Sequence, residues 1–289
     1  MDLRSQWHAF ATLVVKEYNR IVRIWIQTIL PPAITMTLYF IIFGSLIGRR
    51  IGEMDGFGYM EFIAPGLIML AVITNSYGNV VSSFFGAKFG RHIEEMLVSP
   101  MPNYLILLGH VAGGVVRGLM VGGVVTLVAL FFTRLDVQHP WIVLSTVILT
   151  AVVFSLGGFI NAVFAKKFDD ISIVPTFVLT PLTYLGGVFY SISLLPEFWQ
   201  KVSQANPILY MVNAFRYGVL GSSDIPIGTA YAIILLAIAI LAMIGIGLYM
   251  VDMPNSMAKL RMYALHKSIG LTILALALRS VEYILDQLT

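Results

Sequence analysis

Six stretches of the chain are long, apolar and almost free of charged side chains. A helix needs about 20 such residues to cross the hydrocarbon core of a bilayer. The stretches are residues 24–47, 62–85, 104–132, 141–165, 171–192 and 227–251. Charged residues make up 11% of the chain, against about 25% in soluble domains. The sequence therefore predicts an all-α integral membrane protein with six transmembrane helices over residues 1–251 and an extension over residues 252–289.

The lysines and arginines between these stretches indicate the orientation of the chain. Cytoplasmic loops are usually richer in these residues than outer loops. With the N-terminus inside, the inner group is Arg4, Lys16, Arg20, Arg23, Lys88, Arg91, Lys166, Lys167, Lys259, Arg261, Lys267 and Arg279, and the outer group is Arg49, Arg50, Arg134, Lys201 and Arg216. The inner excess predicts six spans with a cytoplasmic N-terminus.

The residues before the first span form an amphipathic pattern. The apolar face holds Trp7, Phe10, Val14, Tyr18, Ile21 and Trp25, and the basic face holds Lys16, Arg20 and Arg23. Steps of three and four residues place each set on one side of a helix. Such a helix lies along the membrane surface, with its basic side near anionic lipid headgroups. A simple lipid anchor would have the same pattern as a helix that also contacts a partner.

The loop between the second and third spans reads "GAKFGRHIEEMLVSPMPNY". Phe89, Ile93 and Met96 share one helix face, and two prolines at positions 100 and 102 end the helix. A short helix of mixed charge on the cytoplasmic side suits docking into a groove of a soluble partner. From spacing alone, an ordinary connecting helix on the lipid surface is equally compatible.

The outer segment between the fifth and sixth spans, residues 191–226, is apolar but interrupted. Its prolines and charges divide it into pieces too short to cross the membrane. Backbone groups at membrane depth must be satisfied by a helix or covered by protein, so the segment predicts a re-entrant hairpin of two short helices. A pair of interfacial helices is the alternative. The residues that we single out are Pro196, Glu197, Phe198, Trp199, Asn206, Pro207 and Arg216.

Arg117 is the one charged residue within the six stretches. A charge at the centre of a span costs about 2.5 to 3.5 kcal/mol even on translocon scales, which makes it a candidate functional residue. It would alternatively snorkel or pair structurally. Glycines at positions 114, 118 and 122 surround it and allow a close helix approach, which favours packing within the chain over a dimer seam.

The chain resembles the permease subunits of type-2 ABC exporters over residues 1–247. The resemblance lies in "RIWIQTILPPAITMTLYFIIFG", "FIAPGLIML", "SSFFGAKFGRHIEEMLVSPMPN", "FDDISIVPTFVLTPLTYLGGVFYSISLLPEFWQ" and "NPILYMVNAFRYGVLG". These stretches are similar to small bacterial permeases that pair with a separate ATPase. The resemblance implies an inner-membrane homodimer that moves an unknown cargo.

The same resemblance implies how the ATPase would couple to this chain. The coupling helix would consist of Lys88, Phe89, Arg91, His92, Ile93, Glu94, Glu95, Met96 and Leu97. The N-terminal helix would add a second contact. Consistent with a borrowed ATPase, the chain contains no Gly-Lys dipeptide and so no P-loop. We expect no catalytic residue, metal or cofactor in this chain, with ATP and Mg²⁺ on the partner, and we expect membrane lipid but no nucleic acid as a further contact.

Two other classes of membrane protein fit the sequence less well. A channel would require polar or charged rings along a pore. A secondary carrier coupled to protons would require carboxylates within the spans, and the six stretches contain none. An ATP-independent transporter or channel therefore remains the alternative to the exporter.

The last residues resemble a different family. Over residues 247–279 the chain is similar to bacterial cytochrome b-561 proteins, in which the residue equivalent to His266 would bind haem. The helices that supply the other axial histidines are missing, so we reject His266 as a haem ligand and a haem electron carrier is only a minor alternative. Charged and apolar residues alternate after Leu278 in a helical pattern. We expect a cytoplasmic amphipathic helix there, with a tilted seventh span as the weaker option.

Overall fold

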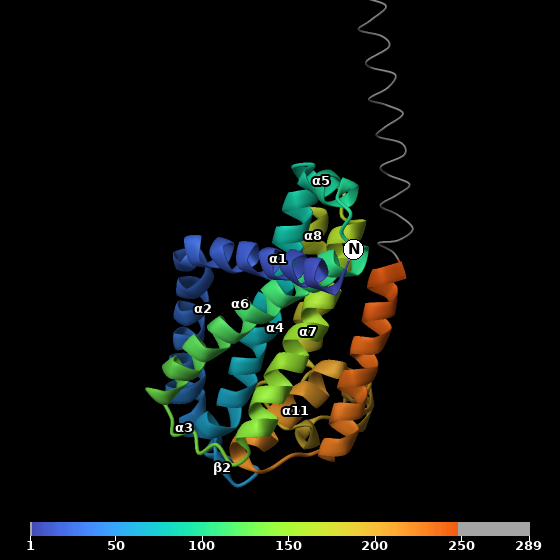
Figure 1. The fold of residues 1–289 in the computed structure, drawn as a ribbon. Coiled ribbons are helices and arrows are strands. Elements are labelled where there is room, and N and C mark those ends of the chain that lie inside the picture. The colour runs from blue at the N-terminus through green and yellow to red at the C-terminus, as the bar shows by residue number, and fades with distance from the viewer. Residues whose placement is uncertain (1, 248–289) are drawn as a thin grey trace, which may run out of the picture. The chain divides into compact units, whose positions relative to one another are not determined.

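A computed structural model describes residues 2–247 of the chain (Figure 1). The expected extension over residues 252–289, His266 and the last residues of the sixth expected span lie outside the described residues. The described part is a bundle of helices with one short β-hairpin. The expectation of an all-α membrane protein is confirmed.

The elements follow one another as a series of long helices joined by short ones. The first half consists of α1 (Leu3–Arg23), α2 (Trp25–Tyr39), the π-helix η1 (Phe40–Ile47), α3 (Gly48–Ile51), the antiparallel strands β1 (Glu53–Met54) and β2 (Phe57–Gly58), α4 (Tyr59–Phe89), α5 (His92–Val98) and α6 (Asn103–Leu130). The second half consists of α7 (Pro140–Phe164), α8 (Asp170–Val174), the π-helix η2 (Pro175–Leu179), α9 (Thr180–Tyr184), the 3₁₀-helix η3 (Ile192–Leu194), α10 (Glu197–Gln204), α11 (Pro207–Leu220) and a final helix, Ile227–Gly247.

Five helices in the described residues are long and apolar enough to cross a membrane. They are Trp25–Gly44, Tyr59–Phe89, Tyr104–Leu130, Pro140–Phe164 and Ile227–Gly247. The expected fifth span, residues 171–192, is not among them. Its helical part ends at Tyr184, because the chain turns at Gly186 and at Gly187, whose φ of +69° ends a right-handed helix. The segment from Asp170 to Tyr184 is therefore a shorter helix than the sequence predicted.

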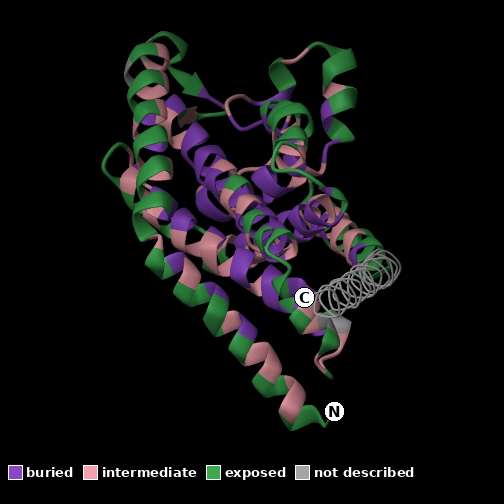
Figure 2. Cartoon of the chain, turned by 90° about the horizontal axis from the view of Figure 1, so that it is seen from above, coloured by how far each residue is buried: buried purple, intermediate pink, exposed green. Residues whose placement is uncertain are grey.

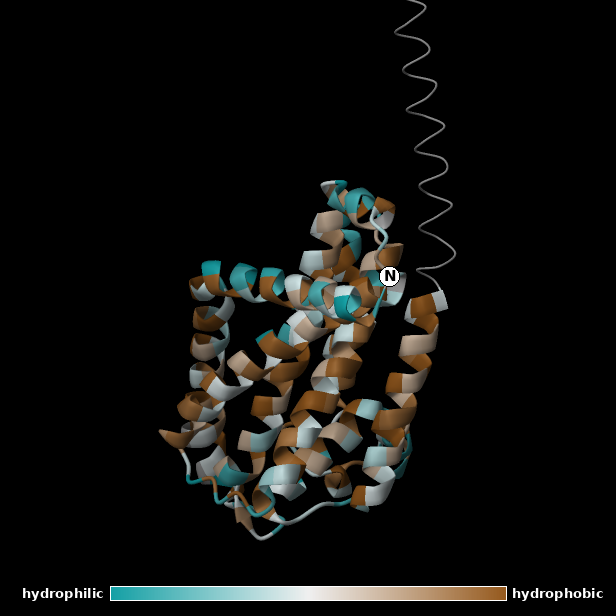
Figure 3. Ribbon diagram, in the orientation of Figure 1, coloured by the Kyte–Doolittle hydropathy of each residue, from teal (hydrophilic) through white to brown (hydrophobic). Residues whose placement is uncertain are grey.

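The core of the bundle forms around α4. This helix packs against α6, α7 and α11, and most of its residues between Tyr59 and Phe85 are buried. Figure 2 shows the buried residues gathered in the middle of the bundle, with the exposed ones on the outward faces of the helices. Figure 3 shows that the outward faces of the long helices are largely hydrophobic and that hydrophilic residues concentrate on α1 and α5. This distribution is that of a helix bundle surrounded by lipid.

The glycines of α6 lie against neighbouring helices of the same chain. A Cβ atom built on Gly114 would lie 2.2 Å from Oγ of Ser155 in α7, and one on Gly118 would lie 2.1 Å from Oγ of Ser76 in α4. Gly113 faces α1 in the same way, at 2.7 Å from Cβ of Glu17. These glycines therefore allow helices to approach within one protomer, as the sequence favoured.

We expect the substitution Gly66→Ala to destabilise the bundle. A Cβ atom at Gly66 in α4 would lie 2.3 Å from the carbonyl oxygen of Val188, a backbone atom that cannot rotate away. Overpacking of this kind costs about 1–3 kcal/mol of the free energy of unfolding. The measurement is thermal unfolding in detergent. The matched control is Gly86→Ala in the same helix, where nothing lies within 4 Å of the added Cβ. Equal melting temperatures for the two variants would contradict the close contact.

Candidate functional site: the inner end and the central cleft

One end of the bundle extends beyond the membrane-crossing region. At about 1.5 Å per residue, the 31 residues of α4 are about 46 Å long, whereas the hydrocarbon core is about 30 Å thick. Figure 1 shows α5 at the tip of this extension, beyond α1, which lies across the bundle. The opposite end carries α3, β2 and α11. The bundle thus presents a short helix, α5, away from the membrane.

The short helix begins later than the sequence predicted. Lys88 and Phe89 belong to the last turn of α4, and Arg91 separates the helices in a left-handed conformation, with φ of 61°. In α5, Ile93 is buried, whereas His92 and Glu95 are exposed and Glu94 and Met96 are half-buried. Of Leu97 only the backbone is described. The exposed side chains of the predicted coupling segment are thus Phe89 and Arg91 before α5 and His92 and Glu95 within it.

Lys88 faces the bundle instead of solvent. Its Nζ donates hydrogen bonds to the carbonyl oxygens of Val163 and of Ala165, the latter at 2.8 Å. These carbonyls belong to the end of α7, where helix carbonyls have no partner within the helix and favour a cation. Lys88 therefore ties the extension of α4 to α7, which positions α5.

The turn after α7 is closed by a carboxylate. The carboxylate of Asp170 accepts hydrogen bonds from the backbone N–H groups of Lys166 at 2.8 Å and Lys167 at 3.0 Å. These bonds to the ionised form lower the pKa of Asp170. The turn is thus held by backbone donors to the carboxylate.

The N-terminal helix α1 packs on the bundle through a face that shares only Ile21 with the predicted apolar face. Its buried residues are Leu13, Glu17 and Ile21, spaced by four. Trp7 and Tyr18, which the pattern placed on the apolar face, are 65% and 50% exposed. The other residues of the predicted faces are half-buried (Phe10, Val14 and Arg20) or exposed (Lys16, Arg23 and Trp25), apart from the buried Ile21. The predicted apolar face is thus divided: its more exposed members, Trp7 and Tyr18, can be covered by lipid, whereas Ile21 packs against the bundle.

Glu17 and Arg20 join α1 to α4. Nη2 of Arg20 lies 3.0 Å from Oε2 of Glu17 and donates a hydrogen bond of 2.7 Å to Oδ1 of Asn79. The hydroxyl of Ser83 donates to Oε1 of Glu17. Arg20, which the sequence placed on the basic face near lipid headgroups, therefore contacts α4 instead. The helix that lies across the bundle is fixed to the same helix whose extension carries α5.

The outer hairpin is built from α10 and α11. Asn206 caps α11, because its Oδ1 accepts the N–H of Ile208 at 3.0 Å and its Nδ2 donates to the carbonyl of Leu182 at 2.6 Å. Arg216 is buried, donates to the carbonyl of Gly187 at 2.7 Å and lies 3.9 Å from the ring centroid of Phe62. Pro196 and Pro207 precede or begin the two helices, and Glu197, Phe198 and Trp199 are exposed on α10. The sequence counted Arg216 as an outer-loop charge, but it anchors α11 to the turn after α9 and to α4.

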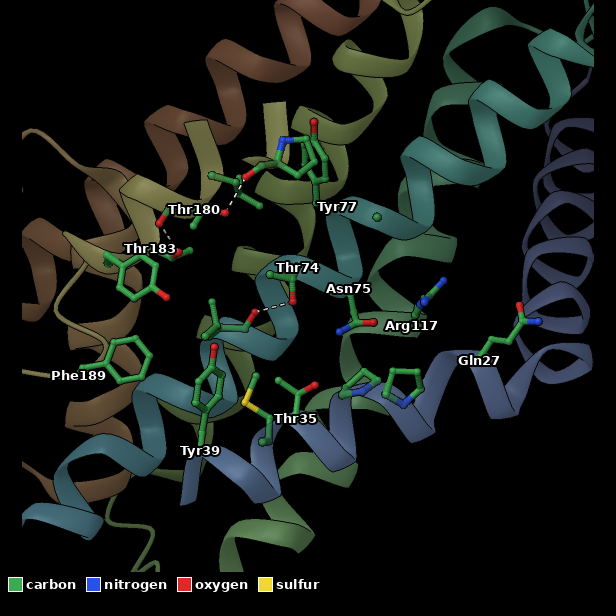
Figure 4. Close-up of a pocket in the computed structure, with 18 residues that line it drawn as sticks. Gln27, Thr35, Tyr39, Thr74, Asn75, Tyr77, Arg117, Thr180, Thr183 and Phe189 are labelled. Atoms are coloured by element: carbon green, nitrogen blue, oxygen red, sulfur yellow. Dashed lines mark hydrogen bonds between the residues drawn. The ribbon is translucent and has the colours of Figure 1, made fainter. Parts of the chain in front are cut away.

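A cleft of about 530 Å³ opens between α2, α4 and the segment from η2 to α9. Its apolar wall includes the rings of Tyr39, Tyr184 and Phe189, which contact one another. Arg117 of α6 and Asn75 of α4 also line it. Figure 4 shows these two polar side chains near each other and away from Phe189. The cleft thus combines an aromatic wall with a region that contains a cation.

Comparison with known proteins identifies the family of the chain. The family model of the ABC-2 type transporter matches residues 8–220. The chain belongs to the ABC-2 type transporter family. The inner membrane transport permease YadH of Escherichia coli strain K12 is 61% identical over 233 residues, which cover 80% of this chain and 91% of that protein. Nodulation protein J of Rhizobium leguminosarum biovar viciae is 24% identical over 189 residues, which cover 64% of this chain and 71% of that protein.

As an ABC-2 protein, the chain is the transmembrane permease subunit of an ABC transporter and a multi-pass protein of the inner membrane. The family implies an ATP-binding subunit as its partner. The family match ends before the residues that resemble cytochrome b-561, and nothing in the comparisons supports that second resemblance.

Several residues of these sites were not identified from the sequence. Glu17 was overlooked, although its spacing of three from Arg20 on a helix is a signal for an ion pair. The ring cluster of Tyr39, Tyr184 and Phe189 had no such signal, because Tyr39 lies far along the chain from the other two. The meeting of these segments is known only from the fold.

Proposed function

We propose that this ABC-2 permease forms a homodimeric export pathway and that a separate ATP-binding subunit docks on α5 and hydrolyses ATP for it. The observation that carries the proposal is the extension of α4, which holds α5 beyond α1 and away from the bundle. A helix of seven residues with exposed His92 and Glu95 fits a groove on a soluble domain. Lys88 holds the end of α4 against α7, and the pair of Glu17 and Arg20 holds α1 against α4. A displacement of α5 would therefore be transmitted to α4.

The homodimer is supported by the unequal burial of the long helices. The exposed fraction is half or more at five apolar residues of α2, namely Trp25, Ile26, Leu30, Ile34 and Leu38. The cleft opens beside this helix. Burying apolar residues against a second copy would complete the wall of the cleft. Lipid covers the apolar surface of the helices that the second copy does not bury.

An ion-coupled carrier is the alternative that we considered. It would require a carboxylate that can exchange protons within the spans. Among the described residues, Glu17 is the only buried acidic side chain, and it is occupied by Arg20 and Ser83. The geometry therefore favours energy input through a partner.

The test is co-expression of the chain with the ATP-binding subunit encoded beside it, followed by purification in mild detergent. We expect a complex containing two copies of each subunit, with vanadate-sensitive ATP hydrolysis. A P-loop lysine substitution in the partner is the control, because it should abolish hydrolysis and keep the complex. Purification of the permease without the ATP-binding subunit, and without vanadate-sensitive hydrolysis, would refute the proposal.

A further inference from the structure

The guanidinium group of Arg117 lines the cleft beside α2 and has no hydrogen bond to any residue that the structure describes. Arg117 lies midway along α6, and its Nε is buried without a hydrogen bond. Among the described residues, no acidic side chain lines the cleft and none forms an ion pair with Arg117. A charge held within the membrane-crossing part of a bundle normally pairs with another group or marks a ligand pathway. Arg117 has the exposure and the position for the second role.

The polar residues of α4 that line the cleft do not compensate the charge of Arg117. Asn75 uses its Nδ2 to donate to the carbonyl of Ala71 at 3.0 Å, and Thr74 donates to the carbonyl of Leu70 at 2.8 Å. Glu17, the buried carboxylate of the bundle, is bound by Arg20 and Ser83. The guanidinium therefore retains donors for an anion that enters the cleft, in surroundings of low dielectric where such a bond is strong.

The rest of the cleft is apolar and aromatic. Figure 4 shows Arg117 at one side and Phe189 and Thr183 at the other, with Tyr39 and Thr35 between the helices. Pro31, Met36 and Leu179 complete the wall. A ligand that satisfies both regions has an anionic group at one end and an apolar chain or ring system at the other.

We propose that the cleft binds amphiphiles that carry a phosphate or carboxylate headgroup, and that Arg117 binds this headgroup. This inference rests on the proposed transport function, because it defines the chemical class of the cargo. The anionic group fixes the ligand at the middle of α6, while the aromatic cluster accepts its apolar part. Neutral and cationic amphiphiles of the same shape lack the contact with Arg117.

The test uses the complex with its ATP-binding subunit in nanodiscs of neutral phosphatidylcholine. Three photoreactive probes share one alkyl diazirine chain and end in a phosphate, a glucoside or a trimethylammonium group. We expect the phosphate probe to label α2 and α4 around the cleft with an affinity about tenfold or more above that of the others. Arg117→Gln should remove this preference, whereas Arg117→Lys should retain most of it.

Two further arms make the result specific. Arg134→Gln is the matched control, because Arg134 is exposed outside the cleft and should not affect labelling. Phosphatidylglycerol added to the nanodiscs distinguishes two sources of the anionic group. If it competes with the phosphate probe, the natural ligand is a membrane lipid, and if it does not, the ligand is a free amphiphile. Both results agree with an anion site.

Equal labelling by the three probes, or unchanged phosphate labelling in Arg117→Gln, would overturn the inference. If Arg117→Gln fails to assemble, the three probes on the wild-type chain and on Arg117→Lys decide the question. Binding is measured without ATP turnover. Equal labelling of a complex that assembles and hydrolyses ATP therefore refutes the anion site alone, whereas absence of the complex refutes the proposed function.

Discussion

Replacing both Glu94 and Glu95 with lysine is expected to release the ATP-binding subunit from the permease. Both acids lie in the first turn of α5, and Glu95 is exposed. Reversal of charges at a docking surface places like charges together wherever the partner is complementary, so the affinity should fall by about tenfold or more. The reversal also removes a favourable interaction of the acids with the helix N-terminus. The measurements are the amount of ATP-binding subunit that co-purifies and the rate of vanadate-sensitive ATP hydrolysis.

The control for this variant lies at the other end of the bundle. Glu197 is also an exposed acid in the first turn of a short helix, α10, but this helix belongs to the outer hairpin. Glu197→Lys changes the charge in the same kind of position and should leave co-purification unchanged. Equal loss in the two variants would mean that the membrane bundle has been disturbed in both. Unchanged assembly in the α5 variant would remove α5 as the docking helix.

The long helices could be predicted from the sequence because bilayer thickness sets a length that apolar runs must reach. Five of the six expected spans appear close to their predicted bounds. The helix of the expected fifth span ends before Gly186 and Gly187, and Gly187 is in a left-handed conformation. Hydropathy does not detect such a residue, so the span was predicted too long. The short helix between α4 and α6 was recognised because Pro100 and Pro102 end it, although its start was placed four residues too early, at Lys88 instead of His92.

The contacts between helices were harder to predict than the helices themselves. The hydrophobic pattern of α1 indicated a stripe from Trp7 through Tyr18 to Ile21, yet only Ile21 of these lies in the face against the bundle, together with Leu13 and Glu17. In lipid, both faces of such a helix can be apolar, so periodicity does not indicate which face meets protein. The acid in the packed face was the informative residue, because a buried carboxylate requires partners from another helix.

Substituting Glu17 with alanine is expected to detach α1 from α4. Glu17 is 2% exposed, whereas the side chain of Arg20 is 28% exposed. Breaking a fully buried ion pair costs about 3–5 kcal/mol, and the partial exposure of Arg20 with its remaining bond to Asn79 lowers this. We therefore expect a loss of about 2–3 kcal/mol in the free energy of unfolding. The measurement is thermal unfolding of the purified permease in detergent.

A double-mutant cycle separates the ion pair from general loss of packing. Arg20→Ala leaves Glu17 buried and bonded only to Ser83, so it should be nearly as costly as Glu17→Ala. The double variant should cost less than the sum of the two, because it removes the charge that each single variant leaves unpaired. Lys16 is an exposed neighbour on α1, so Lys16→Ala is the control and should have the melting temperature of the wild-type chain. Additive losses in the double variant would show that Glu17 and Arg20 stabilise the bundle independently and that the connection between α1 and α4 does not depend on their pairing.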